Sequence, residues 1–286
     1  MKIIHKTAIA LAASGLFATA VFAQTAPAAA PEAPEVSPVT ANVTVTNDYR
    51  YRGISQSNFK PAIQGGFDYA HESGLYIGNW NSSISWISDA APATGSTRVT
   101  APIEMDFYGG IKKELIGEGF ASDLGILQYY YPTSGLNVSG TAANPNTTEL
   151  YLAQNFTFGP VTGFGKLSYS VSPIFGFANS SGSYYPDLTM NYDTGVWGLA
   201  LNAHVGYQFV AGNVQGSAPN VTNSSLYSYT DWKLGVTKDF GGGLSLSAAY
   251  IGTDAKKSSA GTYNYASPTG KNLGGSTGIV SLTNTF

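Results

Sequence analysis

The sequence contains no cysteine, few charged residues and, after its first two dozen residues, no long hydrophobic run. The absence of cysteine among 286 residues excludes a disulfide framework and a thiolate metal site. Only 11% of the residues are charged, whereas a soluble domain is expected to carry about 25%. No stretch after residue 23 approaches the roughly 18 to 20 apolar residues that a membrane-spanning helix needs. The composition therefore disfavours both an ordinary soluble domain and a helical membrane protein.

The first 23 residues have the pattern of a cleavable secretory signal. Lys2 and Lys6 precede a short apolar run, and small residues stand before a predicted cleavage site after Ala23. Removal of this segment takes 2 of the 14 basic residues, which leaves 12 against 17 acidic ones and a net charge of −5. That balance argues against nucleic acid as a partner. Residues 24–38 are rich in Ala and Pro, and we expect a flexible periplasmic lead-in there.

From residue 39 onwards, apolar and polar residues alternate with a period of two. In residues 39–52 the odd positions other than Asn47 are apolar and end with Tyr49 and Tyr51, while the even positions are polar and end with Arg50 and Arg52. Successive side chains of a strand point to opposite faces, so this segment predicts a strand with one apolar and one polar face. Aromatic residues beside a turn are typical of a membrane interface, and we expect both tyrosines there.

The same alternation recurs along residues 39–286 and predicts about 12 antiparallel strands. In the strand expected near 75–87, the apolar face consists of Tyr76, Trp80, Ile84 and Trp86. The faces of 120–131 cannot be assigned from the pattern. Connections alternate between long and short without a break. Long ones are expected near 52–61, 88–101, 132–147, 173–183, 211–225 and 253–275, and short ones near 71–74, 112–119, 159–160, 194–195 and 239–243.

Outer-membrane barrels have short periplasmic turns and long outer loops, and a soluble meander has no reason to follow that rule. Together with the signal segment, the alternation predicts an all-β, transmembrane, up-and-down antiparallel barrel with lipid outside and water inside. A soluble barrel or sandwich is the disfavoured alternative. The final Phe286 falls on the apolar face, as in the last-strand signal read by the barrel-assembly machinery, although Asn284 is polar where that signal is usually apolar.

Several segments also resemble a known family. The run YRYRGISQSNFKPAIQGGFDYAHESGLYIGNW (49–80) is similar to the opening of the TorF-like porin family, also catalogued as the Gcw_chp domain of unknown function. EMDFYGGIKKEL (104–115), DLGILQYYYP (123–132), ELYL (149–152) and AHVGYQF (203–209) follow in the order of that family. The resemblance covers nearly the whole mature chain. It implies an outer-membrane barrel of a Gram-negative bacterium and implies little about the solute.

The charged residues of the barrel segment fall on the polar faces of the expected strands. A basic residue on the lipid face would cost roughly 2 to 4 kcal/mol at the midplane, so any barrel requires this segregation. Asp48, Arg50 and Arg52 lie near the expected outer mouth and are the strongest candidates for a constriction that filters solutes. The other candidates are Asp68, Glu104, Asp106, Glu149, Lys166, Asp231 and Lys233. The alternative is that these charges form ion pairs that brace the wall.

Catalysis has little support in the sequence. Lipid hydrolysis would need a Ser or Thr beside a His base, and the mature chain has two histidines, His71 in an expected periplasmic turn and His204 on the lumen face. No G-x-S-x-G elbow, metal-ligand spacing or nucleotide fingerprint occurs, so neither an enzyme nor a cofactor is predicted.

The sequence therefore predicts an outer-membrane channel through which small hydrophilic solutes diffuse passively. Its expected surroundings are outer-membrane lipid and lipopolysaccharide. The alternative is a non-conducting barrel whose outer loops bind a ligand or surface partner. Barrels of 8 strands are filled by side chains and those of 16 are open, so about 12 strands leave the state of the lumen undecided.

Overall fold

The computed structural model describes residues 37–90, 99–136, 144–216, 221–258 and 260–286. The expected signal segment 1–23 and nearly all of the lead-in 24–38 lie outside these residues. None of the helices in the described ranges is long and apolar enough to cross a membrane.

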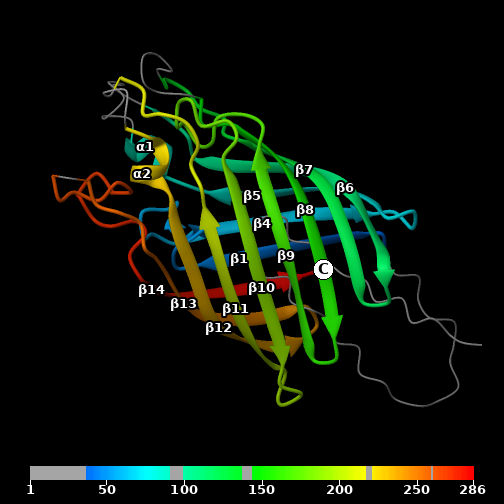
Figure 1. The fold of residues 1–286 in the computed structure, drawn as a ribbon. Coiled ribbons are helices and arrows are strands. Elements are labelled where there is room, and N and C mark those ends of the chain that lie inside the picture. The colour runs from blue at the N-terminus through cyan, green and yellow to red at the C-terminus, as the bar shows by residue number, and fades with distance from the viewer. Residues whose placement is uncertain (1–36, 91–98, 137–143, 217–220, 259) are drawn as a thin grey trace, which may run out of the picture.

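Twelve strands form one closed antiparallel barrel, as the alternation predicts (Figure 1). In order around the barrel the strands are β1 (Val39–Thr46), β4 (Ala62–Ala70), β5 (Leu75–Ser83), β6 (Ile103–Gly117), β7 (Phe120–Tyr130), β8 (Thr147–Phe158), β9 (Val161–Ser170), β10 (Tyr184–Asp193), β11 (Leu199–Gln208), β12 (Tyr229–Gly241), β13 (Leu244–Thr253) and β14 (Thr277–Thr285). Each strand pairs with its neighbour in the chain, and β1 pairs with β14, from Asn42 opposite Thr285 to Thr46 opposite Ser281. The topology is up-and-down.

Four short elements lie outside the barrel ladder. β2 (Arg50–Tyr51) and β3 (Ile54–Ser55) form a separate two-stranded sheet between β1 and β4. α1 (Trp86–Ala90) and α2 (Asn223–Tyr227) are single helical turns, and in Figure 1 both lie at one end of the barrel together with the long loops. We call this the loop end and the opposite one the turn end.

The connections alternate between the two ends as expected, with small shifts in length. β6 continues to Gly117 because Lys112 and Lys113 still pair with Asp123 and Ser122 of β7, so the expected connection 112–119 shrinks to a tight turn. The short connection expected at 194–195 is longer than predicted, since Trp197 still lies in the turn before β11, with a φ of +53°. These differences move strand ends without changing the topology.

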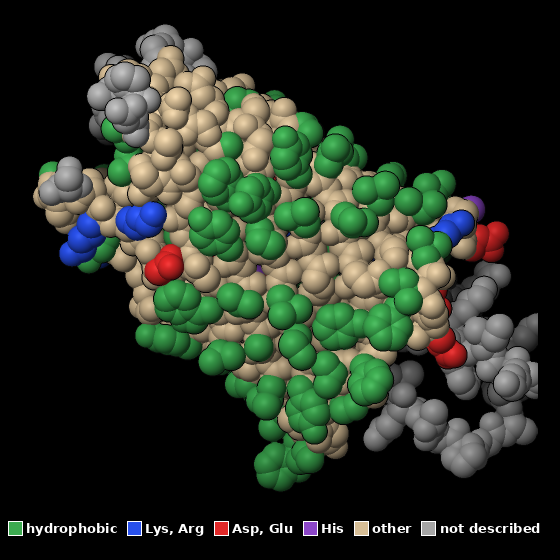
Figure 2. Space-filling model, viewed as in Figure 1, with side chains coloured by type: hydrophobic (Ala, Val, Ile, Leu, Met, Phe, Trp, Pro, Cys, Tyr) green, Lys and Arg blue, Asp and Glu red, His purple; other side chains and the backbone are tan. Residues whose placement is uncertain are grey.

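The outer surface of the barrel is apolar along most strands. Exposed outward residues include Val45, Ile63, Phe67, Ile77, Leu124, Leu152, Leu188, Leu201, Leu234 and Leu282. In the view of Figure 2, the coloured Lys, Arg, Asp and Glu side chains lie at the two ends of the barrel, and hydrophobic side chains spread over the wall between them. This is the distribution that a lipid-embedded wall requires.

The faces expected for β5 are wrong. Tyr76 and Trp80 point into the barrel and are 8% and 5% exposed, while Ile77 points outward and is 61% exposed. The register with β4, which sets Ile77 opposite Tyr69 and Asn79 opposite Phe67, fixes this orientation. Asn79 is tolerated on the outer face because its amide donates a 3.0 Å hydrogen bond to the carbonyl of Asp106.

Candidate functional site

The connection between β1 and β4, residues 47–61, folds into the barrel. We call it the plug segment. Asn47 ends the pairing of β1 with β14, since its side chain donates to the carbonyl of Gly278 (3.2 Å) and accepts from the amide of Val280 (2.8 Å). The next residues turn inward. Tyr49 and Tyr51 are only 2% and 9% exposed, so the expectation that they sit at a membrane interface is wrong.

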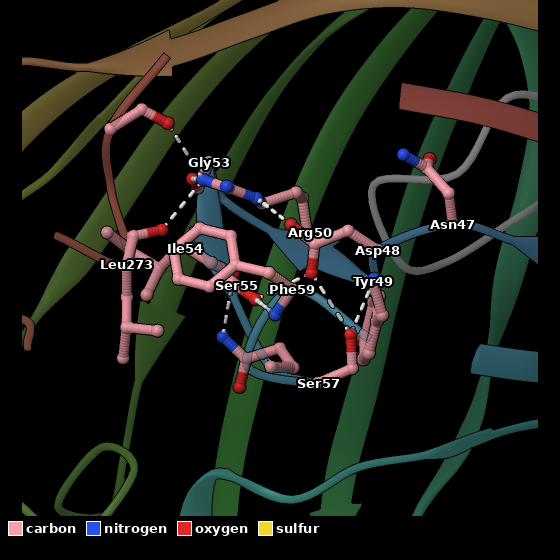
Figure 3. Close-up of polar contacts among 12 residues, drawn as sticks. Asn47, Asp48, Tyr49, Arg50, Gly53, Ile54, Ser55, Ser57, Phe59 and Leu273 are labelled. Carbon is pink, nitrogen blue, oxygen red and sulfur yellow. Dashed lines mark hydrogen bonds and ion pairs between the residues drawn. The ribbon is translucent and has the colours of Figure 1, made fainter. Parts of the chain in front are cut away.

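Asp48 organises the start of the plug segment. Its carboxylate accepts hydrogen bonds from the hydroxyls of Ser55 (2.6 Å) and Ser57 (3.0 Å), and from Nε of Arg50 (2.7 Å) (Figure 3). Nη1 of Arg50 donates to the carbonyl oxygens of Gly53 (2.9 Å), Leu273 (2.7 Å) and Gly275 (3.1 Å). The Asp48–Arg50 ion pair is therefore internal to the segment, and Arg50 also ties it to the connection between β13 and β14.

Arg52 stands at the tip of the β2–β3 hairpin and reaches strands on the far side of the lumen. Its Nη2 donates to Oε2 of Glu149 on β8 (2.7 Å), and its Nη1 donates to Oε1 of Gln208 on β11 (2.6 Å). The guanidinium carbon lies 4.1 Å from the ring centre of Tyr185 on β10. Burial is the largest single effect and lowers the pKa of Arg52, but the Glu149 carboxylate, its hydrogen bond to the guanidinium and the neighbouring Tyr51 and Tyr129 together hold that pKa well above its usual range. Arg52 has a φ of +44°, and Gly53 follows with +76°.

The tyrosines of the plug segment bind the side of the lumen formed by β6 and β7. The Tyr49 hydroxyl donates to Oε1 of Glu104 (2.5 Å), and the Tyr51 and Tyr129 hydroxyls share a 2.5 Å hydrogen bond. Burial, followed by the Glu104 carboxylate, raises the pKa of Tyr49 well above its ordinary value. The segment thus contacts strands on several sides of the barrel.

Near the loop end, the plug segment and the inner face of the wall pack together. Every one of the twelve strands has an inward residue at this level that is between 0% and 8% exposed. In order around the barrel these are Thr46, Gln64, Ser82, Glu104, Tyr129, Glu149, Ser170, Tyr185, Gln208, Asp231, Ile251 and Ser281. Nearer the turn end, inward residues such as Asp68, Asn155, Thr162 and Asn191 are partly exposed. Inward residues are therefore buried on every strand at the level of the plug segment, whereas nearer the turn end some are buried, such as Ala121 and Ser245, and others are partly exposed.

The inner surface differs from one side to the other. On β5–β8 it is aromatic and packed, and we call this side the tyrosine wall. Its buried members are Tyr76, Trp80, Tyr108, Tyr129 and Tyr151. Tyr49 packs on Trp80, with ring centres 5.6 Å apart, and Tyr51 packs edge-on against Tyr129 at 5.5 Å. The main cluster of buried apolar residues therefore fills part of the lumen.

Tyrosine hydroxyls satisfy most of the acidic groups on that side. Glu104 accepts from Tyr131 (2.6 Å) as well as from Tyr49. Asp123 accepts from Tyr76 and Asp68 accepts from Tyr108, both at 2.6 Å. Two acids differ. Glu149 on β8 is bound by Arg52, and Asp106 is 0% exposed with no hydrogen-bond partner for either carboxylate oxygen in the described structure. Apart from these two, tyrosine hydroxyls, which are neutral donors, bind the carboxylates on this side.

On β12–β14 and β1 the inner surface consists mainly of small residues, and we call it the hydroxyl wall. Its members include Thr44, Thr46, Thr237, Ser245, Ser247, Ala249, Ser281 and Thr283. Thr44 and Thr283 share a 2.8 Å hydrogen bond across the barrel seam, and Ser281 donates to Thr46 at 2.9 Å. Ser247, Ala249 and Thr283 are partly exposed. These three positions are thus partly accessible, whereas Thr44, Thr46, Thr237, Ser245 and Ser281 and the named members of the tyrosine wall are buried.

A charged cluster lies between the two walls, on β9–β12. His204 is held between the carboxylates of Asp187 (3.1 Å from Nδ1) and Asp231 (2.9 Å from Nε2). Lys166 stands 4.0 Å from Asp187, and its side chain is 16% exposed. The Tyr185 hydroxyl donates to Asp231 at 2.8 Å, which connects the cluster to the ring on which Arg52 stacks. Lys233 is buried in the same region.

All ten residues expected to line a constriction lie inside the barrel. Asp48, Arg50 and Arg52 are on the plug segment, and the other seven are on the inner face of the wall, namely Asp68, Glu104, Asp106, Glu149, Lys166, Asp231 and Lys233. Arg52 and Glu149 are brought together, whereas Lys166 and Asp68 stand apart from the plug contacts. Their role in selecting solutes stays a prediction.

The sequence analysis missed Tyr185, Gln208 and Tyr129 as partners of the plug segment. Each falls on an inward position of its strand, but the alternation gives no indication of what crosses the lumen to meet it. In the described residues no group of three or more His, Cys, Asp or Glu side chains could hold a metal ion.

The fold is that of a porin-like β-barrel. The NanC porin superposes with a TM-score of 0.50 at 8% identity, over 86% of this chain and 98% of that one. The KdgM porin gives a TM-score of 0.48 at 5% identity, over 87% and 98% of the two chains. OprD from Pseudomonas aeruginosa gives 0.40 at 12% identity, over 88% of this chain and 67% of that one.

A family model described as a bacterial protein of unknown function (Gcw_chp) matches residues 28–286. The chain therefore belongs to the Gcw_chp family. No curated protein sequence matches the chain.

Proposed function

We propose that the protein is an outer-membrane channel through which small hydrophilic solutes diffuse, and that the plug segment holds it closed at the loop end. The single observation that carries this proposal is the division of the barrel into an apolar outer surface and a polar inner one. A barrel that is packed only for stability would have large apolar side chains inside. Small hydroxyl side chains on the inner face are instead suited to a water-filled path.

The path we propose runs along the hydroxyl wall and past Lys166 and His204. The tyrosine wall is packed against the plug segment, so solutes have little room on that side. Asp68, Glu104 and Glu149 are bound by tyrosines or by Arg52, which reduces their part in filtering solutes by charge. The remaining accessible charge of Lys166 is the better candidate for a filter on the open path.

The location follows from the same features. We propose export by the signal segment, cleavage after Ala23, and insertion into the outer membrane beside lipid and lipopolysaccharide. Phe286 faces outward, is 72% exposed, and exchanges two backbone hydrogen bonds with Ala41 next to the barrel seam. That position suits recognition of the last strand by the barrel-assembly machinery.

The test is single-channel conductance in a planar bilayer for the wild type and for a variant with residues 50–55 replaced by a short Gly-Ser linker. We expect small or rare openings in the wild type and stable openings, at least several-fold larger on average, in the variant. Replacement of loop residues 260–263 by the same linker is the control, because it changes an outer loop without removing Arg50, Arg52 or Tyr265, whose carbonyl accepts from Leu273.

The closed loop end gives a specific reason to keep a second candidate, a non-conducting barrel whose loops bind a surface partner. If the variant without residues 50–55 is folded, judged by its slower migration after boiling, but carries no current, the channel proposal fails. The loops would then be the functional surface.

A further inference from the structure

The place where Arg52 docks has the chemistry of a binding site for a planar cation. The guanidinium donates one hydrogen bond to Glu149 and another to Gln208, at 2.7 and 2.6 Å, and its plane is covered by an aromatic ring. A carboxylate, an amide oxygen and aromatic rings are the groups that proteins use to recognise guanidinium ligands. Here the ligand belongs to the same chain.

The docking groups belong to the wall and not to the plug segment. Glu149 on β8 pairs with Leu127 and Ser170 of its two neighbouring strands. Tyr185 on β10 pairs with Ser168 of β9, and Gln208 on β11 pairs with Tyr229 of β12. Gln208 is held further by its own amide, which donates to the carbonyl of Phe209 at 3.0 Å. The Tyr185 hydroxyl is anchored on Asp231. These groups would therefore keep their arrangement if the hairpin tip moved away.

The docking partner, by contrast, stands on a strained tip. Arg52 has a positive φ, which a residue with a Cβ rarely adopts, and Asn58 and Phe59 in the same segment have positive φ as well. The β2–β3 sheet has only two residues in each strand. A rigid site and a strained occupant make the contact a candidate for exchange.

We propose that Arg52 is an internal substitute for a cationic solute, and that the wall site of Glu149, Gln208 and Tyr185 binds solutes that carry a guanidinium group. Such a solute would compete with Arg52 and release the hairpin tip, so the channel would open to the class of solute that it binds. The binding site is inferred from geometry alone. The opening of the channel by a bound solute also rests on the proposed channel function.

A free solute must compete with the Arg52 side chain, which is covalently attached near the site. A side chain attached to the same chain acts at an effective concentration of the order of millimolar or higher. We therefore expect free ligands to bind weakly to the wild type and much more strongly once the arginine side chain is removed. The most direct test removes the Arg52 side chain by substitution and adds a small guanidinium compound in solution.

The experiment uses the refolded barrel of Arg52→Ala, with ethylguanidinium as the probe and ethylurea as the uncharged control of the same shape. We expect ethylguanidinium at ten times its dissociation constant to raise the thermal midpoint of the folded barrel by about 4 °C. Ethylurea should leave the midpoint unchanged. The double variant Arg52→Ala/Glu149→Gln should lose the effect. No shift with Arg52→Ala, or an equal shift with ethylurea, would overturn the site.

If Arg52→Ala does not fold, the same titration is made with Arg52→Gln, whose shorter uncharged side chain leaves Glu149 without its cationic partner. Conductance is the second readout. Block of the Arg52→Ala current by ethylguanidinium, absent in the double variant, supports the site within a channel. A thermal shift without any current keeps the site and removes the channel, whereas a current without a shift or block keeps the channel and removes the site.

Discussion

The tyrosine wall and the hydroxyl wall line the same lumen but differ in the size and packing of their side chains. On β5–β8, large rings pack against the plug segment and their hydroxyls satisfy buried carboxylates. On β12–β14 and β1, small residues bond to one another across the seam and leave inner positions accessible. The difference teaches that one side of this barrel is built like the core of a soluble domain, while the other is built like the wall of a pore.

The comparison predicts a large difference in stability between the walls. Trp80→Ala removes a buried ring that packs on Tyr49, so we expect a loss of about 3 to 5 kcal/mol in the free energy of unfolding. Ser247→Ala on the hydroxyl wall should change it by less than about 0.5 kcal/mol. Urea unfolding in detergent micelles measures both. Equal losses would remove the distinction between the two walls.

Within the tyrosine wall, replacement of two neighbouring acids by their amides should change stability differently. Glu104→Gln weakens the charge-assisted hydrogen bonds from Tyr49 and Tyr131, and we expect a loss of about 1 to 3 kcal/mol. Asp106→Asn removes a buried carboxylate that has no hydrogen-bond partner in the described structure, so stability should stay the same or rise by about 1 kcal/mol. The same unfolding assay applies. A larger loss for Asp106→Asn than for Glu104→Gln would contradict the assignment of tyrosine hydroxyls as the stabilising donors.

The hydroxyl wall should control conduction. Ala249 points inward and Ala248, next to it on β13, points outward. In the variant without residues 50–55, Ala249→Trp should lower the single-channel conductance by about half or more, because an indole would fill part of the narrow path. Ala248→Trp places the same side chain in the outer surface and should leave conductance unchanged. A reduction by both substitutions, or by neither, would place the path elsewhere.

The smallest expected effect is on pH dependence. Burial and Glu104 raise the pKa of Tyr49 above its ordinary value of about 10. The closed plug therefore holds the phenol proton more tightly than an open one. Its contribution to closure is complete below pH 10 and declines as the pH rises from there toward the raised pKa. Open probability should increase above pH 10 in the wild type and less so in Tyr49→Phe. An equal increase in both would assign it to another group.

Much of the barrel could be predicted from sequence because lipid and water impose a period of two on every strand. Ile63, Phe67 and Tyr69 alternate without interruption, and the structure places them on the outer face as the pattern predicts. In β5 the pattern fails, because tyrosine and tryptophan fit both a lipid interface and a packed interior. Pairing with β4 then decides the orientation, and pairing cannot be read from β5 alone.

The plug segment could not be predicted for a related reason. Tyr49, Arg50, Tyr51 and Arg52 continue the alternation of β1 and so read as an extension of that strand. The one available signal was composition, since the other long loops are rich in Gly, Ser, Thr and Asn, while this connection carries two arginines, an acid and three aromatic residues. Three aromatic residues in one connection are costly to expose to water and indicate burial, and charged residues carried in with them need partners of opposite charge.

The seam between β1 and β14 has a consequence for the order of assembly. Its partners are far apart in the chain, as Thr44 and Thr283 are 239 residues apart, while every other ladder joins neighbouring strands. Closing so long a loop is entropically the most demanding step, so we expect this ladder to form last. The plug segment directly follows β1, so it enters a sheet that is still open and is enclosed when the two edges meet. The barrel would then close around the plug segment, and the segment need not be inserted into a barrel that is already closed.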